Sequence, residues 1–349
     1  MNLTRRTVEA TEAGAKAGAD GPEPSSGRPG GGAGRAVAVL VLVAVGALIP
    51  LLGPRAALDG TGEAGAPGAG GIALLRAVLL AALCVPVGEL FVAWLVRRVP
   101  GARREAPRSW APWAAGAGFM ASLGLASVVA TGNLVPDSPA DMDVGGLYET
   151  RDGRLALLEV NAFAAAGLLA LSRRPAAQAL PLAAVVVAET LRAHPTTEYS
   201  PLIGTGLTLV HLACAALWAG GLLHVLRTLR LRAWRSTQAG AAVLGRYARV
   251  AAVLFAGITA TGVWSTLRRM PPGTVLDQLT ETAYGRALLA KVLLVAAVAA
   301  LALRARLRLR RASDDRLDIC APARAEVAVL GAVVAVSALL TALPVPIRW

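Results

Sequence analysis

The residues best suited to metal chemistry lie within residues 194–226. All three histidines of the protein are found there: His194, His211 and His224. His211 stands inside an apolar run, where a polar side chain is costly unless it has a partner or a function. Cys214 follows at i+3 and therefore shares its helix face. Neutral imidazole is the commonest metal ligand and sulfur ligands favour Cu(I), so this face predicts a copper site.

Further candidate ligands lie near the outer ends of the apolar runs. His194, in a short loop before the run of His211, would supply a second nitrogen, and Met142, in an acidic loop, would capture copper at the surface. Each candidate has a structural alternative. His211 would hydrogen-bond a neighbouring helix, Cys214 would pack as a small hydrophobe, and Met142 would be an ordinary loop residue. His224, near the inner interface, is expected to have an interfacial role.

Other ionisable residues fall inside apolar runs. Glu159 and Glu189 lie on consecutive runs, and Lys291 lies on a later one. Such groups usually face the interior of a helix bundle and pair with one another or line a pathway. We therefore expect an internal polar path, with Lys291 paired to one of the two carboxylates. A purely structural ion pair is the alternative.

The composition requires a membrane protein. The 349 residues are 55% hydrophobic and 16% charged, with a mean hydropathy of +0.57. A soluble protein does not carry this much apolar surface. The net charge of +13 would suit nucleic acid, but the arginines cluster at the ends of apolar runs, as the positive-inside rule describes. Nucleic acid is therefore not an expected partner, and the lipid bilayer is.

Apolar runs of about 20 residues predict an all-α, polytopic transmembrane bundle of about nine spans. The runs lie near 36–53, 71–96, 111–131, 155–172, 176–193, 202–226, 247–268, 284–304 and 323–343.

The loops predict the orientation in the plasma membrane. Arginines follow the second, fourth, sixth and eighth runs, so these loops share one side if the N-terminus is cytoplasmic and the C-terminus lies outside. We expect residues 1–34 to be a disordered cytoplasmic tail, because their composition cannot bury a core. Residues 35–175 would form an N-terminal region of about four spans, and residues 176–349 a second region of about five. Alternatively, residues 36–53 are a signal sequence.

Several activities are excluded by missing motifs or by arithmetic. The chain has no G-x-x-x-x-G-K-[ST] loop and no recognisable hydrolytic triad, so we expect no enzyme and no direct use of ATP. A bis-His haem needs two imidazoles on one iron. His211 and His224 are about 20 Å apart along a helix and cannot share one haem. A single haem between His194 and His211 remains possible.

Two segments carry a family resemblance. Residues 211–222, HLACAALWAGGL, resemble the H-L-x-x-x-x-x-W-x-G-G-L pattern of the copper-resistance D (CopD) family, and residues 282–291, TAYGRALLAK, resemble its T-x-Y-G-R-x-L-L-x-K element. The similarity extends over about residues 190 to 345. It implies an inner-membrane protein of copper uptake or resistance that takes copper from an extracytoplasmic, CopC-like donor. No β-patterned segment is fused here, so that donor would be a separate protein.

The combined prediction is a membrane protein that binds copper near its outer face and carries it inward or confers copper resistance. Its expected ligands are His211 and His194, with Cys214 and Met142 as secondary candidates. A membrane redox protein holding one haem is one alternative. A non-transporting sensor or assembly factor is the other.

Overall fold

The computed structural model describes residues 30–101, 105–194, 200–231, 233–234, 237–270, 272–311 and 331–343. Every secondary-structure element in these ranges is a helix, which confirms the predicted all-α class. The chain divides into two units, Met1–Val41 and Leu42–Trp349. Only the start of helix α1 (Gly30–Leu58) is described in the first unit, and residues 1–29 of the predicted tail lie outside the described residues.

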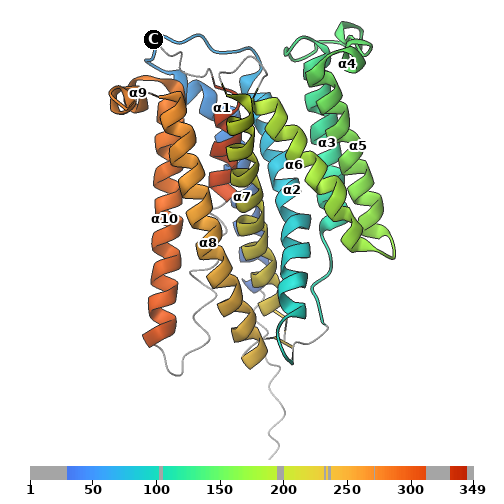
Figure 1. The fold of residues 1–349 in the computed structure, drawn as a ribbon, viewed down its shortest axis with the longest axis vertical. Helices are drawn as coiled ribbons and strands as arrows, with labels where there is room; N and C mark the ends of the chain where they lie inside the picture. The colour runs from blue at the N-terminus through green and yellow to red at the C-terminus, as the bar shows by residue number, and fades with distance from the viewer. Residues whose placement is uncertain are drawn as a thin grey trace, which may run out of the picture. The chain divides into compact units, whose positions relative to one another are not determined.

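Seven of the described helices are long and apolar enough to cross a membrane (Figure 1). They are α2 (Ala69–Arg97), α3 (Ala111–Ala130), α5 (Arg151–Leu171), α6 (Ala179–Ala193), α7 (Pro201–Leu229), α8 (Gln238–Arg269) and α10 (Ala283–Arg311). Two shorter apolar helices overlap the first and ninth predicted runs. They are the later part of α1, Val43–Leu58, and the helix Gly331–Leu340. The chain is thus a multi-pass membrane protein, in agreement with about nine spans.

Short helices lie in the connections between the long helices, and two of the long helices begin with a capping threonine. The connections contain η1 (Pro139–Asp141), α4 (Gly146–Glu149), η2 (Pro175–Gln178) and α9 (Val275–Glu281). Thr150 caps α5, because its hydroxyl accepts the N–H of Gly153, and Thr237 caps α8 in the same way through Gly240. These caps satisfy backbone donors where the helices begin.

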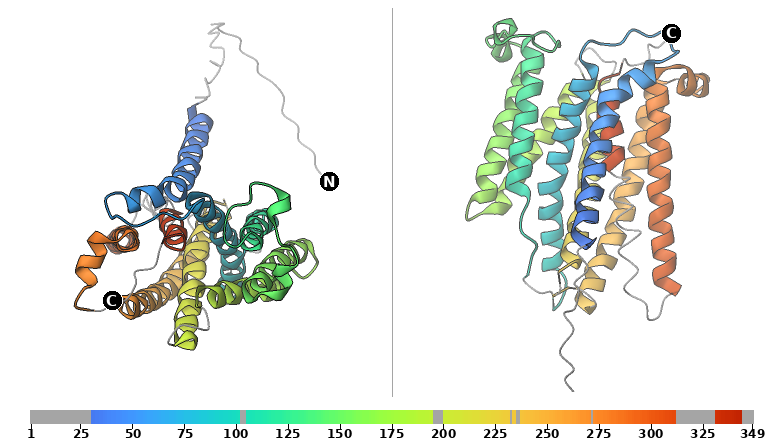
Figure 2. Two further views of the ribbon diagram at one scale, coloured as in Figure 1. Left: turned by 90° about the horizontal axis from the view of Figure 1, so that it is seen from above. Right: turned by 180° about the vertical axis from the view of Figure 1, so that it is seen from behind.

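The connections of the second unit alternate between its two ends, as the arginine pattern predicted. The α2–α3, α5–α6 and α7–α8 connections lie at one end, and α4 and α9 lie at the other (Figures 1 and 2). At the arginine-rich end, the indole N–H of Trp234 donates to the carbonyl of Glu105 at 2.7 Å. The α2–α3 and α7–α8 connections therefore touch each other.

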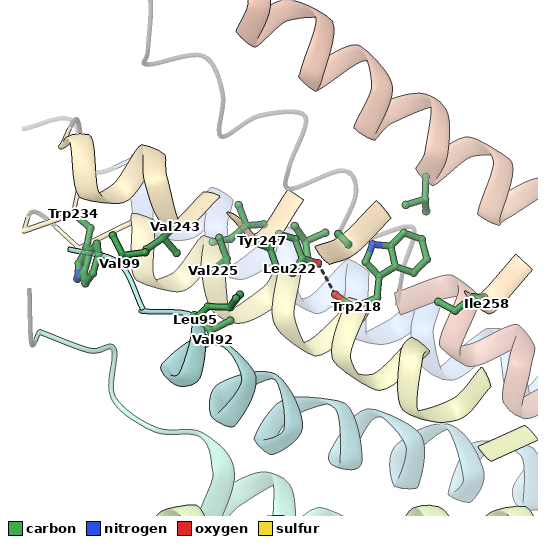
Figure 3. Close-up of a cluster of buried hydrophobic side chains, with 13 residues drawn as sticks. Val92, Leu95, Val99, Trp218, Leu222, Val225, Trp234, Val243, Tyr247 and Ile258 are labelled. Carbon is green, nitrogen blue, oxygen red and sulfur yellow. Dashed lines mark hydrogen bonds between the residues drawn. The ribbon is translucent and has the colours of Figure 1, made fainter. Parts of the chain in front are cut away.

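Helix α2 lies between two apolar cores. One contains Phe163 and joins α2 to α3, α5 and α6, and the other joins α2 to α7 and α8 (Figure 3). In the second core the Tyr247 hydroxyl donates to the carbonyl of Trp218 at 2.7 Å. Helices α2 and α7 meet at Gly88 and Gly220. A Cβ on Gly220 would lie 1.9 Å from the carbonyl oxygen of Cys84, so the two backbones touch only because these side chains are absent.

Candidate functional site

His211 lies on the face of α7 that packs against α8. Its Nδ1 is 3.0 Å from the hydroxyl oxygen of Thr261 on α8, and the ring is half-buried. The Thr261 hydroxyl also lies 2.7 Å from the carbonyl of Gly257, to which it donates. When the single proton of this hydroxyl is donated to Gly257, the contact with His211 is one in which Nδ1–H donates and Thr261 accepts.

This arrangement determines which ring nitrogen of His211 can bind a metal. With the proton on Nδ1, the lone pair of the neutral imidazole is on Nε2. Metal-binding histidines commonly donate their other ring N–H to a neighbouring acceptor, which holds the ring and its tautomer. Thr261 supplies that acceptor here. In that tautomer Nε2 is the ring nitrogen of His211 that is free to accept.

Cys214 and Trp218 share the same face of α7 and also contact α8. A Cβ added to Gly257 would lie 3.3 Å from the sulfur of Cys214, so the thiol rests against the α8 backbone. The Trp218 ring meets Phe255 of α8 edge-on, with the ring centroids 5.5 Å apart. The helix face that His211 and Cys214 share is therefore the α7–α8 interface, and Cys214 is a half-buried free thiol within it.

His194 ends α6 and reaches α7 one turn away from His211. It is buried, its Nε2 lies 2.8 Å from the Thr208 hydroxyl, and its ring packs on Gly204. Thr208 precedes His211 by three residues and is therefore its neighbour on the helix surface. The fold thus brings both histidines to the half of α7 that lies away from the arginine-rich end, with each ring hydrogen-bonded to its own threonine. Sequence reasoning missed both threonines as partners.

Met142 lies in a different group of elements. It follows η1 and precedes α4, which packs on α3 and α5 (Figure 1). Its side chain is half-buried. The structure gives it no role in the α7–α8 interface where His211 lies.

Glu159 and Glu189 pair with arginines, which corrects the expectation that Lys291 pairs with one of them. Arg192 lies 2.9 Å from Glu159 and 3.9 Å from Glu189, and Arg76 lies 2.9 Å from Glu189. Glu159 is fully buried. The reason is proximity: α2, α5 and α6 pack together and bring two opposite charges to these carboxylates. Arg76 interrupts the apolar run 71–96, and this charge was the available signal.

Lys291 lies on α10, apart from the cluster formed by Glu159, Glu189 and their arginines. Its side chain is half-buried, and its ammonium group lies within electrostatic range of the His211 imidazole. Among the residues that the structure describes, no carboxylate lies within ion-pairing distance of it. Lys291 therefore forms no ion pair with Glu159 or Glu189.

His224 faces α2, on the side of α7 away from His211. Its Nδ1 lies 3.9 Å from Glu89, whose carboxylate accepts from Ser109 and from the N–H of Trp110 at 2.6 and 2.7 Å. Arg227 lies 3.1 Å from Glu89 and stacks on the Trp110 ring. These contacts hold the arginine-rich ends of α2, α3 and α7 together, as expected for an interfacial histidine.

In the described part of the chain, no three His, Cys, Asp or Glu side chains are grouped as a metal cage.

Comparison with known proteins identifies one family. Residues 241–340 match the family model described as Copper resistance protein D. This range covers most of α8, all of α9 and α10, and the helix Gly331–Leu340. No curated protein matches the chain, and no solved structure does.

Proposed function

We propose, from the premise that this chain is a CopD family protein, that it binds copper at His211 near its outer face and assists its passage across the membrane. Membership in this family indicates a membrane protein of copper resistance or transport. The proposal adds the site, the direction from outside to inside, and the role of copper as cargo.

The arrangement of His211 carries the proposal. Its Nδ1 is held by Thr261, so Nε2 is the nitrogen with the lone pair. Cu(I) accepts few ligands of the nitrogen and sulfur type, and Cys214 follows one turn later on the same face. Cys214 is the proposed secondary ligand.

His194 is the proposed receiving ligand on the outer side. It contacts α7 at Thr208, one turn from His211, and would pass copper inward to it. Met142 would act earlier, as a surface capture residue. The copper would come from a separate extracytoplasmic, CopC-like donor. This order assumes that the arginine-rich end of the bundle faces the cytoplasm.

Glu159, Glu189 and Lys291 are the proposed polar groups that line or support the path. The two carboxylates belong to a buried cluster with Arg76 and Arg192, and Lys291 belongs to the His211 side. Since no ATP-binding loop occurs, transport would be passive or coupled to an ion gradient.

The test is copper stoichiometry on detergent-purified protein, with an optical spectrum of the same sample. Wild type is compared with His211→Ala, and His224→Ala is the matched control, because it removes the same side chain from the opposite face of α7. We expect about one copper per chain in wild type and in the control, and loss of copper in His211→Ala. Equal copper in all three proteins would refute the assignment of His211.

The optical spectrum tests the remaining alternatives. A Soret band that disappears in His211→Ala would favour a single haem held by His194 and His211. Absence of both copper and haem from well-folded wild type would favour the sensor or assembly-factor alternative.

A further inference from the structure

A small pocket lies at the arginine-rich end of the second unit, between the end of α2 and the start of α8. Its volume is about 240 Å³, and it is lined by Val99, Pro100, Ala242, Gly245, Arg246 and Arg249. Sites for whole drug-sized ligands occupy roughly 300–1,000 Å³. This pocket therefore suits a small polar group. It lies away from His211 and has no part in the proposed copper site.

One wall of the pocket is a stripe of α8 with small residues followed by arginines. Ala242, Gly245, Arg246 and Arg249 recur at helical spacing and so share one face. A Cβ added to Gly245 would meet no atom within 4 Å, so the absent side chain leaves open space. Arg246 is half-buried and donates through Nη1 to the carbonyl of Arg98, which orients its guanidinium against the end of α2.

Among the residues that the structure describes, no carboxylate forms an ion pair with Arg246 or Arg249. No Asp or Glu occurs in the sequence between Glu198 and Asp277. In the described segments at this end of the unit, Glu105 is the acidic residue of the α2–α3 connection, and it forms no ion pair with Arg246 or Arg249. Positive charge at a partly enclosed site suits an anionic ligand. Arginine recognises phosphate through paired N–H donors.

The surroundings place the pocket at the level of lipid head groups. Trp94, one turn before the end of α2, is 40% exposed, and the guanidinium of Arg98 lies 3.8 Å from the centre of its ring. Exposed tryptophans at the ends of spans mark the membrane interface. Basic pockets between transmembrane helices on the cytoplasmic side are suited to anionic lipid head groups.

We propose that the pocket formed by Val99, Pro100, Gly245, Arg246 and Arg249 binds the phosphate group of an anionic phospholipid. Arg246 and Arg249 hold the phosphate, and the acyl chains run along the exposed apolar surface of the bundle. The single negative charge of the phosphodiester partly offsets the two arginines, and the bound lipid ties the end of α2 to α8.

The test is lipid binding measured by native mass spectrometry, with phosphatidylglycerol compared with phosphatidylcholine. Each arginine near an anionic surface contributes about 1 kcal/mol. We therefore expect affinity for phosphatidylglycerol to fall about fivefold in Arg249→Gln and about thirtyfold in Arg246→Gln/Arg249→Gln. Arg249→Gln keeps the hydrogen bond from Arg246 to the carbonyl of Arg98, so its result can be interpreted even if the double variant misfolds.

Two further variants distinguish lipid binding in this pocket from general electrostatic attraction to the basic end of the bundle. Arg173→Gln/Arg174→Gln removes the same charge from an exposed loop at the same end and should leave affinity unchanged. Gly245→Leu keeps every charge but fills the pocket, and it should lower the affinity for phosphatidylglycerol. An equal loss in the Arg173/Arg174 variant, or full affinity in Gly245→Leu, would overturn the proposal.

Glycerol phosphate at increasing concentration distinguishes lipid from free phosphate. We expect it to compete weakly, because it lacks the acyl chains. Displacement of the lipid at equimolar glycerol phosphate would show a site for soluble phosphates and overturn the assignment to lipid.

Discussion

Substitution of Gly220 by alanine should destabilise the bundle by breaking the close contact between α2 and α7. A Cβ at this position would lie 1.9 Å from the carbonyl oxygen of Cys84 and 3.0 Å from the backbone nitrogen of Gly88. Both obstacles are backbone atoms, which cannot move to a new rotamer. Ordinary van der Waals contact begins near 3.4 Å, so α2 and α7 would have to separate by about 1.5 Å.

The expected cost follows from that separation. Overpacking a close interface typically costs about 1–3 kcal/mol, and a backbone obstacle favours the upper end. A gap of 0.5–1 Å already forfeits roughly a quarter to a half of each dispersion contact along the interface. We expect a loss of about 3 kcal/mol in the free energy of unfolding, or roughly 5 °C in Tm.

The assay is thermal unfolding of the purified protein in detergent, with Gly206→Ala as the matched control. Gly206 lies on the same helix, and a Cβ there would meet no atom within 4 Å. Replacing a helical glycine by alanine otherwise stabilises by about 0.5–1 kcal/mol. The two variants should therefore shift the Tm in opposite directions.

Equal Tm values for Gly220→Ala and Gly206→Ala would show that α2 and α7 do not approach through Gly88 and Gly220. The explanation of the α2–α7 contact by the missing side chain of Gly220 would then be wrong.

Three other substitutions test single interactions. Glu159→Gln should lower the free energy of unfolding by about 3 kcal/mol, because it removes the carboxylate nearest to Arg192, whereas exposed Glu149→Gln should change it by less than about 0.5 kcal/mol in the same detergent melts. Tyr247→Phe should lower the free energy of unfolding by about 1 kcal/mol, because it removes the buried hydrogen bond to the carbonyl of Trp218. Tyr148→Phe, at an exposed site, should have the Tm of wild type. Equal Tm values for the two variants would contradict the hydrogen bond. Thr261→Ala should weaken copper binding about 10- to 100-fold, because it removes the hydrogen-bond partner of His211, and Thr261→Ser should preserve it. Competition with a copper chelator measures both affinities. Equal affinities in the two variants would show that Thr261 does not support His211.

The spans, and the connections that share one end of the bundle, could be predicted from the sequence, because they depend on local properties. About 20 apolar residues suffice to cross a bilayer, and arginines mark the inner ends whatever the neighbouring helices are. The grouping of His211, Cys214 and Trp218 on one face was also predictable. Helix periodicity relates these residues without reference to any other part of the chain.

The partners of those faces could not be predicted, because each comes from a helix far along the chain. Thr261 reaches His211 from α8, and Arg192 and Arg76 reach Glu159 and Glu189 from α6 and α2. Lys291 was an equally reasonable partner for the carboxylates by charge alone. Electrostatic attraction falls with distance, and the packing of α2, α5 and α6 sets those distances. The hydrogen bond between His211 and Thr261 was decided in the same way by the approach of α7 to α8.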